Sequence, residues 1–172
     1  MLDFLRDQVD PRRFLERRGN FIRAAWETLS PLPGGKQAFS ALIARLAPYT
    51  GTIRATVLEL ERTRALLEMK DRPSLRNHLG SIHAIALANL AELSGNIALA
   101  YGLPDDARFI VLRLEIDYLK KARGTLHAEG RAPLVSDSSE KEVEVEVEIR
   151  NSQGERCAQA KIRSLVGPKK GK

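Results

Sequence analysis

The sequence is poor in several residue types and patterns that would define its class. Its single cysteine, Cys157, excludes an intrachain disulfide and a zinc site built on cysteines, and it fits a reducing compartment. Aromatic residues make up only 5% of the chain, which argues against a surface that stacks single-stranded bases. No run approaches the roughly 18 apolar residues of a membrane span, and the start, "MLDFLRDQVDPRR", has no apolar stretch typical of a signal peptide. We therefore expect a cytoplasmic protein without membrane insertion.

The charge balance is basic, with a formal net charge of +6 and a pI near 9.7. This balance suits an anionic partner such as nucleic acid, an acidic membrane surface or a phosphate-bearing small molecule. Simple solubility explains it equally well. The length of 172 residues suits one domain, or one domain with a helical extension, and the hydrophobic fraction of 43% can fill a core.

Helical periodicity dominates the first third of the chain. Apolar residues recur at helical spacing from Leu15 to Leu29, and arginines stand between them. Two prolines and two glycines in "SPLPGG" stop this pattern. A second apolar stripe runs from Phe39 to Leu46 and ends before Pro48, which predicts a second, shorter helix.

Strand patterns surround one long helix in the rest of the chain. The run 51–70 splits near Arg62 into two β-type segments, and a long helix is predicted from about His83 to Ala100. Four more strands are predicted over residues 108–118, 124–131, 141–150 and 156–165. A single long helix among six strands argues against alternating parallel α/β units. We therefore predict an α+β fold in which a curved antiparallel sheet of about six strands wraps the helix.

The clearest strand is "KEVEVEVEIR", where four glutamates alternate strictly with three valines and one isoleucine. This period of two is typical of a strand with one buried and one solvated face. The glutamates could suggest acid chemistry or metal binding. A charged, aggregation-resistant surface explains them better, and we assign them no function.

The long helix is apolar nearly all round, which predicts burial and makes its polar members informative. These members are His83, Asn89, Glu92, Ser94 and Asn96. Nine residues separate His83 from Glu92, a rise of about 14 Å, so the two cannot meet around a small substrate within one chain. They could meet across a two-fold axis between antiparallel helices, which would give two equivalent sites.

The stretch "NHLGSIHAIALANLAE" resembles the motif of the hotdog-fold acyl-CoA thioesterase superfamily, in particular its PaaI-like branch and a related hotdog family of unknown function. Those proteins place an Asn and a His-Gly before a core helix, and an acid in its second or third turn. By element order, the resemblance implies an N-terminal helical extension over 1–33, a hotdog domain over 34–166 and a basic tail over 167–172. It implies thioester hydrolysis of a fatty or aryl acyl-CoA by a homodimer, or by a homotetramer that is a dimer of dimers.

The resemblance also implies roles for individual residues. Glu92 from one subunit would be the base or nucleophile, and the N–H of Ala84 in the other would polarise the thioester carbonyl. His83 would orient the loop or assist at the carbonyl, and Asn77 would hold water or the acyl carbonyl. Gly80 completes the motif. Ala84 stands where the branch usually has Gly, and the strand after the helix lacks the Ser or Thr that often places the water.

The substrate implied by the resemblance is anionic, and a basic cluster offers contacts for its phosphates. Lys120, Lys121 and Arg123 precede the turn at Gly124. No separate cofactor or metal is implied, because coenzyme A is part of the substrate. An alternative is a non-catalytic hotdog protein that binds acyl-CoA or fatty acyl ligands. A third, weaker reading gives the Arg-rich helix over residues 12–23 a membrane-surface or nucleic-acid contact. Packing of its Leu15, Ile22 and Trp26 stripe on the sheet or at a subunit interface explains this helix better, so we expect no nucleic-acid partner.

Overall fold

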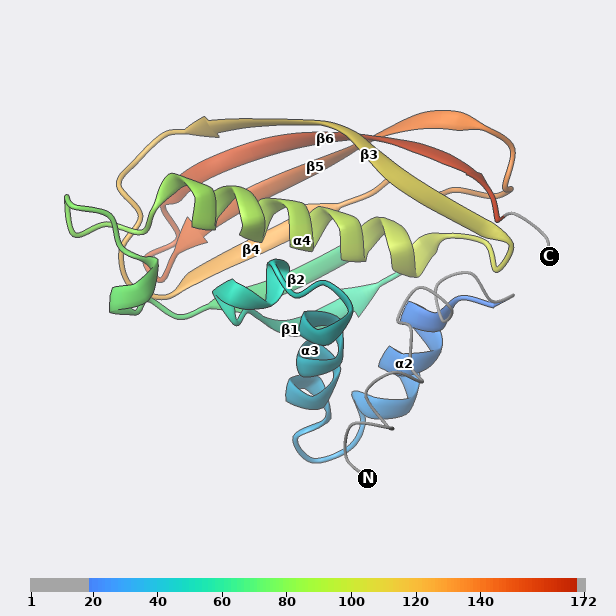
Figure 1. Cartoon of the computed structure of the whole chain (residues 1–172), viewed down its shortest axis with the longest axis horizontal. Helices are drawn as coiled ribbons and strands as arrows, with labels where there is room; N and C mark the ends of the chain where they lie inside the picture. Colours follow the sequence, from blue (N-terminus) through green and yellow to red (C-terminus); the bar gives the residue numbers. More distant parts are fainter. Residues whose placement is uncertain (1–18, 170–172) are drawn as a thin grey trace, which may run out of the picture.

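A computed structural model describes residues 19–169, so most of the Arg-rich stretch and the last three residues of the basic tail lie outside the described part. Within it, a curved sheet wraps one long helix, and two shorter helices stand to one side (Figure 1). The helices are α2 (Phe21–Leu29), α3 (Gly35–Leu46) and α4 (Ala84–Gly102), with short 3-10 helices η1 (Thr50–Ile53) and η2 (Pro73–Leu75). The strands are β1 (Thr56–Glu61), β2 (Arg64–Met69), β3 (Ala107–Tyr118), β4 (Leu126–Arg131), β5 (Lys141–Asn151) and β6 (Arg156–Pro168).

The six strands form one sheet in the order β1-β2-β4-β5-β6-β3, and every neighbouring pair is antiparallel. A sheet of this kind around a central helix is the hotdog fold, so the predicted fold class is confirmed. β3 is an edge strand because it pairs only with β6 among the described strands. A register shift between Val111 and Arg113 leaves Leu112 without a partner residue and bends this edge.

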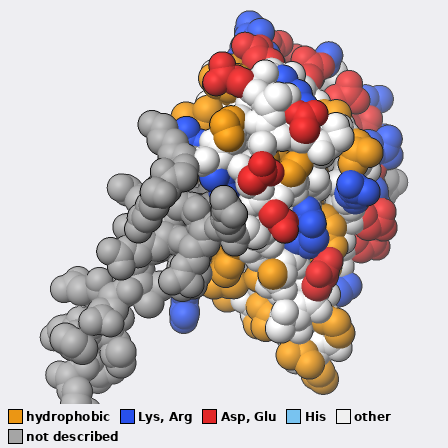
Figure 2. Space-filling model, turned by 90° about the vertical axis from the view of Figure 1, so that its right-hand side faces the viewer, with side chains coloured by type: hydrophobic (Ala, Val, Ile, Leu, Met, Phe, Trp, Pro, Cys, Tyr) orange, Lys and Arg blue, Asp and Glu red, His pale blue; other side chains and the backbone are white. Residues whose placement is uncertain are grey.

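The alternating strand β5 has the predicted two faces. Val145, Val147 and Ile149 are buried, whereas the glutamate side chains lie on the outer face of the sheet. There Lys161 on β6 pairs with Glu144 at 3.0 Å. Acidic and basic side chains are interspersed over this side of the molecule, and apolar side chains gather at the opposite, helical end (Figure 2).

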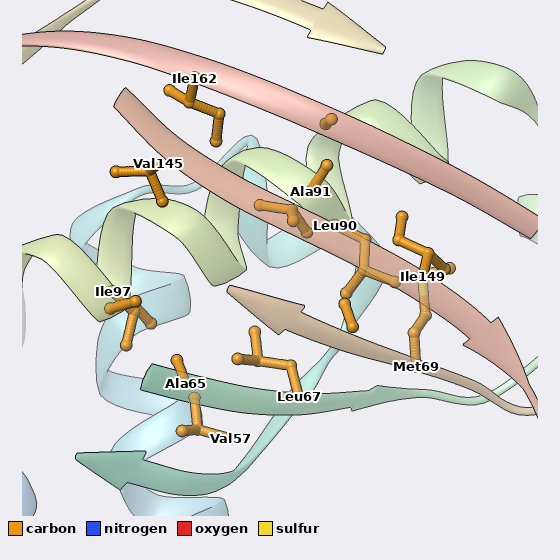
Figure 3. Packing of buried hydrophobic residues seen from close by; sticks show 14 of the residues in the cluster. Val57, Ala65, Leu67, Met69, Leu90, Ala91, Ile97, Val145, Ile149 and Ile162 are labelled. Carbon is orange, nitrogen blue, oxygen red and sulfur yellow. The ribbon is translucent and has the colours of Figure 1, made fainter. Parts of the chain in front are cut away.

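Small residues let α4 lie close against the sheet. A Cβ added at Gly95 would come within 2.6 Å of Ile162 Cδ1, and one added at Gly130 on β4 within 2.5 Å of the Ser94 carbonyl oxygen. Larger apolar side chains fill the space between, and Figure 3 shows Leu90 of α4 packed among side chains of β2 and β5. The helix thereby forms the centre of the core.

The prediction that α4 is buried nearly all round is wrong for one face. Ile85 is 53% exposed and Glu92 is exposed, because neither the sheet nor the shorter helices cover this side. By length and hydropathy α4 could cross a membrane, but 56% of its most apolar window is buried inside the protein. This burial is typical of the core helix of a globular protein.

The shorter helices close the other end of the core. The rings of Trp26 on α2 and Phe39 on α3 meet edge to face, 5.1 Å apart. Asn20 caps α2 by accepting a hydrogen bond from the Arg23 amide, and its Nδ2 donates to the Ala100 carbonyl oxygen at 2.7 Å. One side chain thus starts α2 and ties it to the last turn of α4.

Candidate active site at the start of the core helix

The loop before α4 is organised by Asn77. Its Oδ1 accepts hydrogen bonds from the backbone amides of Leu79 at 2.9 Å and Ser81 at 3.3 Å. The backbone amide of Asn77 donates to the Ser81 carbonyl oxygen. Gly80 has a positive φ of 66°, which closes this turn without side-chain strain. Asn77 therefore shapes the loop, and its Oδ1 is already engaged within it.

His83 caps α4. Its Nδ1 accepts a hydrogen bond from the Ile85 amide at 3.1 Å, and its own amide donates to the Leu75 carbonyl oxygen at 2.7 Å. In the neutral imidazole an accepting Nδ1 leaves the proton on Nε2. The exposed ring thus has an N–H donor available beside the helix start. The structure adds a capping function to the orienting role expected for His83.

The first amide of α4 is that of Ala84. It has no hydrogen-bond partner within residues 19–169, as expected for a first-turn amide. The hydroxyl of Tyr118, at the end of β3, donates to the Ala84 carbonyl oxygen at 3.1 Å. Partial burial raises the pKa of Tyr118, so this hydroxyl keeps its proton. No sequence pattern indicated a role for Tyr118, yet this residue ties the edge strand to the helix start.

Glu92 lies two turns further along α4 and does not reach the helix start. Eight residues separate it from Ala84, a rise of about 12 Å. Within residues 19–169 its only neighbour in hydrogen-bond range is Asn96, whose Nδ2 lies 3.5 Å from Glu92 Oε1. The expected apolar setting of this carboxylate is not present in the single chain, where Glu92 is exposed.

A cavity of about 170 Å³ opens beside the start of α4, between η1, η2 and the first two turns of the helix. His83 and Ile85 line one part of it, and Asn89 lines another. Asn89 is only 6% exposed, and its Nδ2 donates to the Tyr49 carbonyl oxygen at 3.2 Å. In the sequence Asn89 is a polar residue on an apolar helix, and this alone indicated no function for it.

Residues 35–166 match the family described as "Domain of unknown function (DUF4442)". The chain belongs to the DUF4442 family. No curated protein is significantly similar to it in sequence.

Solved structures share the fold of this DUF4442 protein. The structure described as "genomics APC5556" is 26% identical, with a TM-score of 0.74, and the match covers 86% of this chain and 99% of that one. The Pseudomonas aeruginosa protein PA5026, described as of unknown function and "Probable Thioesterase", is 21% identical, covers 80% and 97%, and has a TM-score of 0.67. The Haemophilus influenzae thioesterase HI1161 is 14% identical, covers 70% and 82%, and has a TM-score of 0.62. All three share the fold of this chain, and two of them are described as thioesterases, HI1161 outright and PA5026 as probable.

The basic cluster of the DUF4442 chain lies against the same loop. The Ala122 carbonyl oxygen accepts from the Ile82 amide at 2.9 Å, and Arg123 Nη2 donates to the Leu79 carbonyl oxygen at 3.4 Å. Lys120 points elsewhere, to an ion pair with Glu155. Of the three residues predicted to contact phosphates, Arg123 therefore lies beside the site, whereas Lys120 is held in an ion pair with Glu155.

Proposed function

We propose that this DUF4442 protein is an acyl-CoA thioesterase that acts as a homodimer, with each active site built from two subunits. The observation that supports this most directly is the unpartnered amide of Ala84, at the positive end of a 19-residue helix and beside the imidazole of His83. An amide in this position can stabilise the oxyanion of a tetrahedral intermediate. One such donor typically contributes about 2.7–4 kcal/mol to the transition state.

The hydrolysis needs a base for water, and Glu92 is the candidate. The partner's Glu92 takes a proton from water as the water oxygen bonds to the thioester carbon. The Ala84 N–H and the His83 Nε2–H stabilise the resulting oxyanion. The intermediate collapses as the C–S bond breaks. The Glu92 carboxyl returns its proton to the departing sulfur, so that coenzyme A leaves as the thiol. Asn77 and Gly80 hold the loop that presents these donors.

Two open surfaces support a two-fold dimer. The face of α4 that carries Ile85 and Glu92 is uncovered, and the edge strand β3 exposes Ile110 by 63% and Leu112 by 49%. Large apolar side chains at a free strand edge are typical of a subunit interface. A dimer formed across this edge brings two copies of α4 together, and two dimers can associate further into a tetramer.

The substrate enters from the cytoplasm with its own coenzyme, so the proposed reaction needs no separate cofactor. Arg123, which lies beside the loop, and the exposed Lys121 would contact the coenzyme A phosphates, whereas Lys120 would first have to leave Glu155. The alternative is a protein that binds acyl-CoA or fatty acyl ligands without turnover. Two observations favour it: Ala84 narrows the approach that a Gly would leave open, and Glu92 is in solvent in the single chain.

Substitution of Glu92 distinguishes thioester hydrolysis from acyl-CoA binding without turnover. We expect the purified protein to hydrolyse acyl-CoAs, and Glu92→Gln to lower kcat at least 10³-fold while the chain stays folded. Glu140→Gln is the matched control, because Glu140 is also exposed and lies far along the chain in the segment before β5. Equal rates in the two variants would contradict the role of Glu92. Tight acyl-CoA binding without turnover would favour the ligand-binding alternative.

The interface is tested through the strand edge. We expect Ile110→Lys to convert the dimer to a monomer in sedimentation and to abolish turnover, because each site needs the partner's Glu92. Leu32→Lys is the control, since Leu32 is 56% exposed but lies at the helical end. A wild-type protein that is monomeric and active would overturn the two-subunit site.

A further inference from the structure

Tyr118 contacts the start of α4 through a hydrogen bond that the helix itself does not require. Its hydroxyl lies 3.1 Å from the Ala84 carbonyl oxygen, and because a carbonyl oxygen can only accept, the hydroxyl is the donor. A carbonyl in the first turn of a helix already accepts an intrahelical hydrogen bond, and only the last four carbonyls lack one. The Tyr118 hydroxyl therefore uses the second lone pair of this oxygen, and its effect is on the orientation of the peptide group.

The peptide group between Ala84 and Ile85 is held at both ends by side chains. Its oxygen accepts a hydrogen bond from Tyr118, and its N–H donates to His83 Nδ1 at 3.1 Å. Hydrogen bonds in such a chain polarise and strengthen one another. The Tyr118 hydroxyl therefore favours the neutral imidazole whose Nδ1 accepts, and this form carries its proton on Nε2. The His83 Nε2–H is one of the two donors proposed for the oxyanion.

The strand end that carries Tyr118 is fixed by the sheet. Tyr118 is the last residue of β3, and the two backbone amides that follow it both donate to the Cys157 carbonyl oxygen of β6, at 2.9 and 3.1 Å. A group supported by a strand of the scaffold is placed more precisely than a group on a loop. The Ala84 N–H, the second proposed donor, is separated from the held peptide group only by the Ala84 Cα. The anchored hydroxyl thus acts on both donors.

We propose that Tyr118 is a positioning residue for thioester hydrolysis, which orients the His83 Nε2–H and the Ala84 N–H through the peptide group that follows Ala84. This inference rests on the proposed function for the identity of the reaction. Tyr118 does not contact the thioester in this role. It sets the geometry of two donors that act on the oxyanion as it forms. Loss of the hydroxyl should therefore lower kcat and leave KM unchanged.

The test removes only the hydroxyl, with Tyr118→Phe, and keeps the ring and its packing. The substrate is hexanoyl-CoA or benzoyl-CoA, whichever the wild type hydrolyses faster. We expect kcat to fall at least fivefold, with KM within twofold of the wild-type value. Tyr101→Phe is the matched control, because its hydroxyl donates to Glu27 Oε1 at 3.3 Å near the other end of α4, about 25 Å along the helix axis from Ala84. We expect this control to keep the wild-type kcat.

A second measurement follows the hydrogen-bond chain without turnover. Nitrogen-15 NMR of the His83 imidazole distinguishes a nitrogen that carries a proton from one that accepts a hydrogen bond. We expect the share of the Nε2–H form to fall in Tyr118→Phe and to keep its wild-type value in Tyr101→Phe. A tyrosine that only packs the strand end against the helix would change stability without changing this share.

The outcomes separate this inference from the proposed activity. Equal kcat in the wild type, Tyr118→Phe and Tyr101→Phe keeps the hydrolase and overturns the positioning role. A loss that lies wholly in KM, or a lower kcat with an unchanged imidazole spectrum, also overturns it. A wild type that hydrolyses neither substrate overturns the hydrolase and with it the role in turnover. The spectra then decide the hydrogen-bond chain alone: a change confined to Tyr118→Phe keeps it, and equal spectra overturn it.

Discussion

The two halves of the core helix α4 have different surroundings. The first half begins at an open loop, borders a cavity and exposes Ile85 and Glu92. The second half is enclosed, and a Cβ added at its last residue, Gly102, would lie 2.2 Å from the Arg62 carbonyl oxygen. One helix thus serves as scaffold at one end and presents chemical groups at the other. Substitutions in the second half should act on stability, and those at the exposed positions of the first half should act on activity, whereas core residues of the first half such as Leu90 also act on stability.

The largest change in stability is expected where the second half meets the sheet. Gly130→Ala places a Cβ 2.5 Å from the Ser94 carbonyl oxygen and 2.9 Å from the Gly95 nitrogen, both backbone atoms that cannot move aside. We expect a loss of roughly 1–3 kcal/mol in unfolding free energy, measured by denaturant titration. Gly167→Ala is the control, because a Cβ there has no neighbour within 4 Å. Equal stability in both variants would contradict the close approach of helix and sheet.

At the open end, the cap and the chemistry of His83 can be separated. His83→Ala removes the acceptor for the Ile85 amide and should cost about 1 kcal/mol, the typical contribution of a side-chain cap. His83→Asn restores an acceptor without an imidazole. We expect it to recover the stability but not the turnover, as measured by melting and by kcat. Recovery of both would show that His83 is only a cap.

A smaller effect is expected from the ion pair that holds the same loop. Asp71 Oδ1 lies 2.8 Å from Arg76 Nε, and Asp71 Oδ2 accepts from the Gly124 amide. The hydrogen bond from Arg76 holds the pKa of Asp71 below its ordinary value of about 3.9, and the Gly124 amide acts in the same direction.

The pH dependence of this pair follows from the sign of the pKa shift. A carboxyl whose pKa is lowered by folding stabilises the protein above its unfolded pKa, and the gain is lost as pH falls through the folded pKa. Asp71→Asn should therefore cost less than about 1 kcal/mol at pH 7, since Arg76 is half in solvent. In thermal melts at acid pH, the difference in unfolding free energy between Asp71→Asn and the wild type should shrink below about pH 4. A difference that stays constant down to pH 2 would rule out the ion pair as its cause.

The smallest effect on stability is expected at Glu92. Because the side chain is exposed, Glu92→Gln should change the unfolding free energy by less than about 0.5 kcal/mol. The proposed loss of turnover would then occur in a chain of unchanged stability, which is the reverse of the result expected for Gly130→Ala. A strongly destabilised Glu92→Gln, measured by denaturant titration at a concentration where the chain is monomeric, would show a structural role.

Sequence patterns predicted the fold well because its signals are local. The alternation in β5, the break near Arg62 and the apolar run of α4 each depend on neighbouring residues, and the structure has an element at each place. The exposure of Glu92 was not predictable in the same way. It depends on which side of α4 the sheet leaves uncovered, and the angle between helix and sheet is set by contacts such as Gly95 with Ile162.

The site was only partly accessible from sequence for the same reason. The motif located Asn77, Gly80, His83 and Ala84, which are close in the chain and lie together at the helix start. The surroundings of Asn89 depend on η1, some 40 residues earlier in the chain, because Thr52 of η1 borders the same cavity. A buried amide on an apolar helix was the available signal, but nothing in the sequence indicated which segment would face it.

The outer face of the sheet has a consequence for the charge of the whole molecule. Glu142, Glu144 and Glu148 lie opposite arginines and lysines of β5 and β6, so this broad surface is nearly neutral. The surplus positive charge of the chain therefore resides elsewhere, on loops and ends such as the stretch around Lys121 and Arg123. We therefore expect little electrostatic attraction of an anion toward this outer face of the sheet.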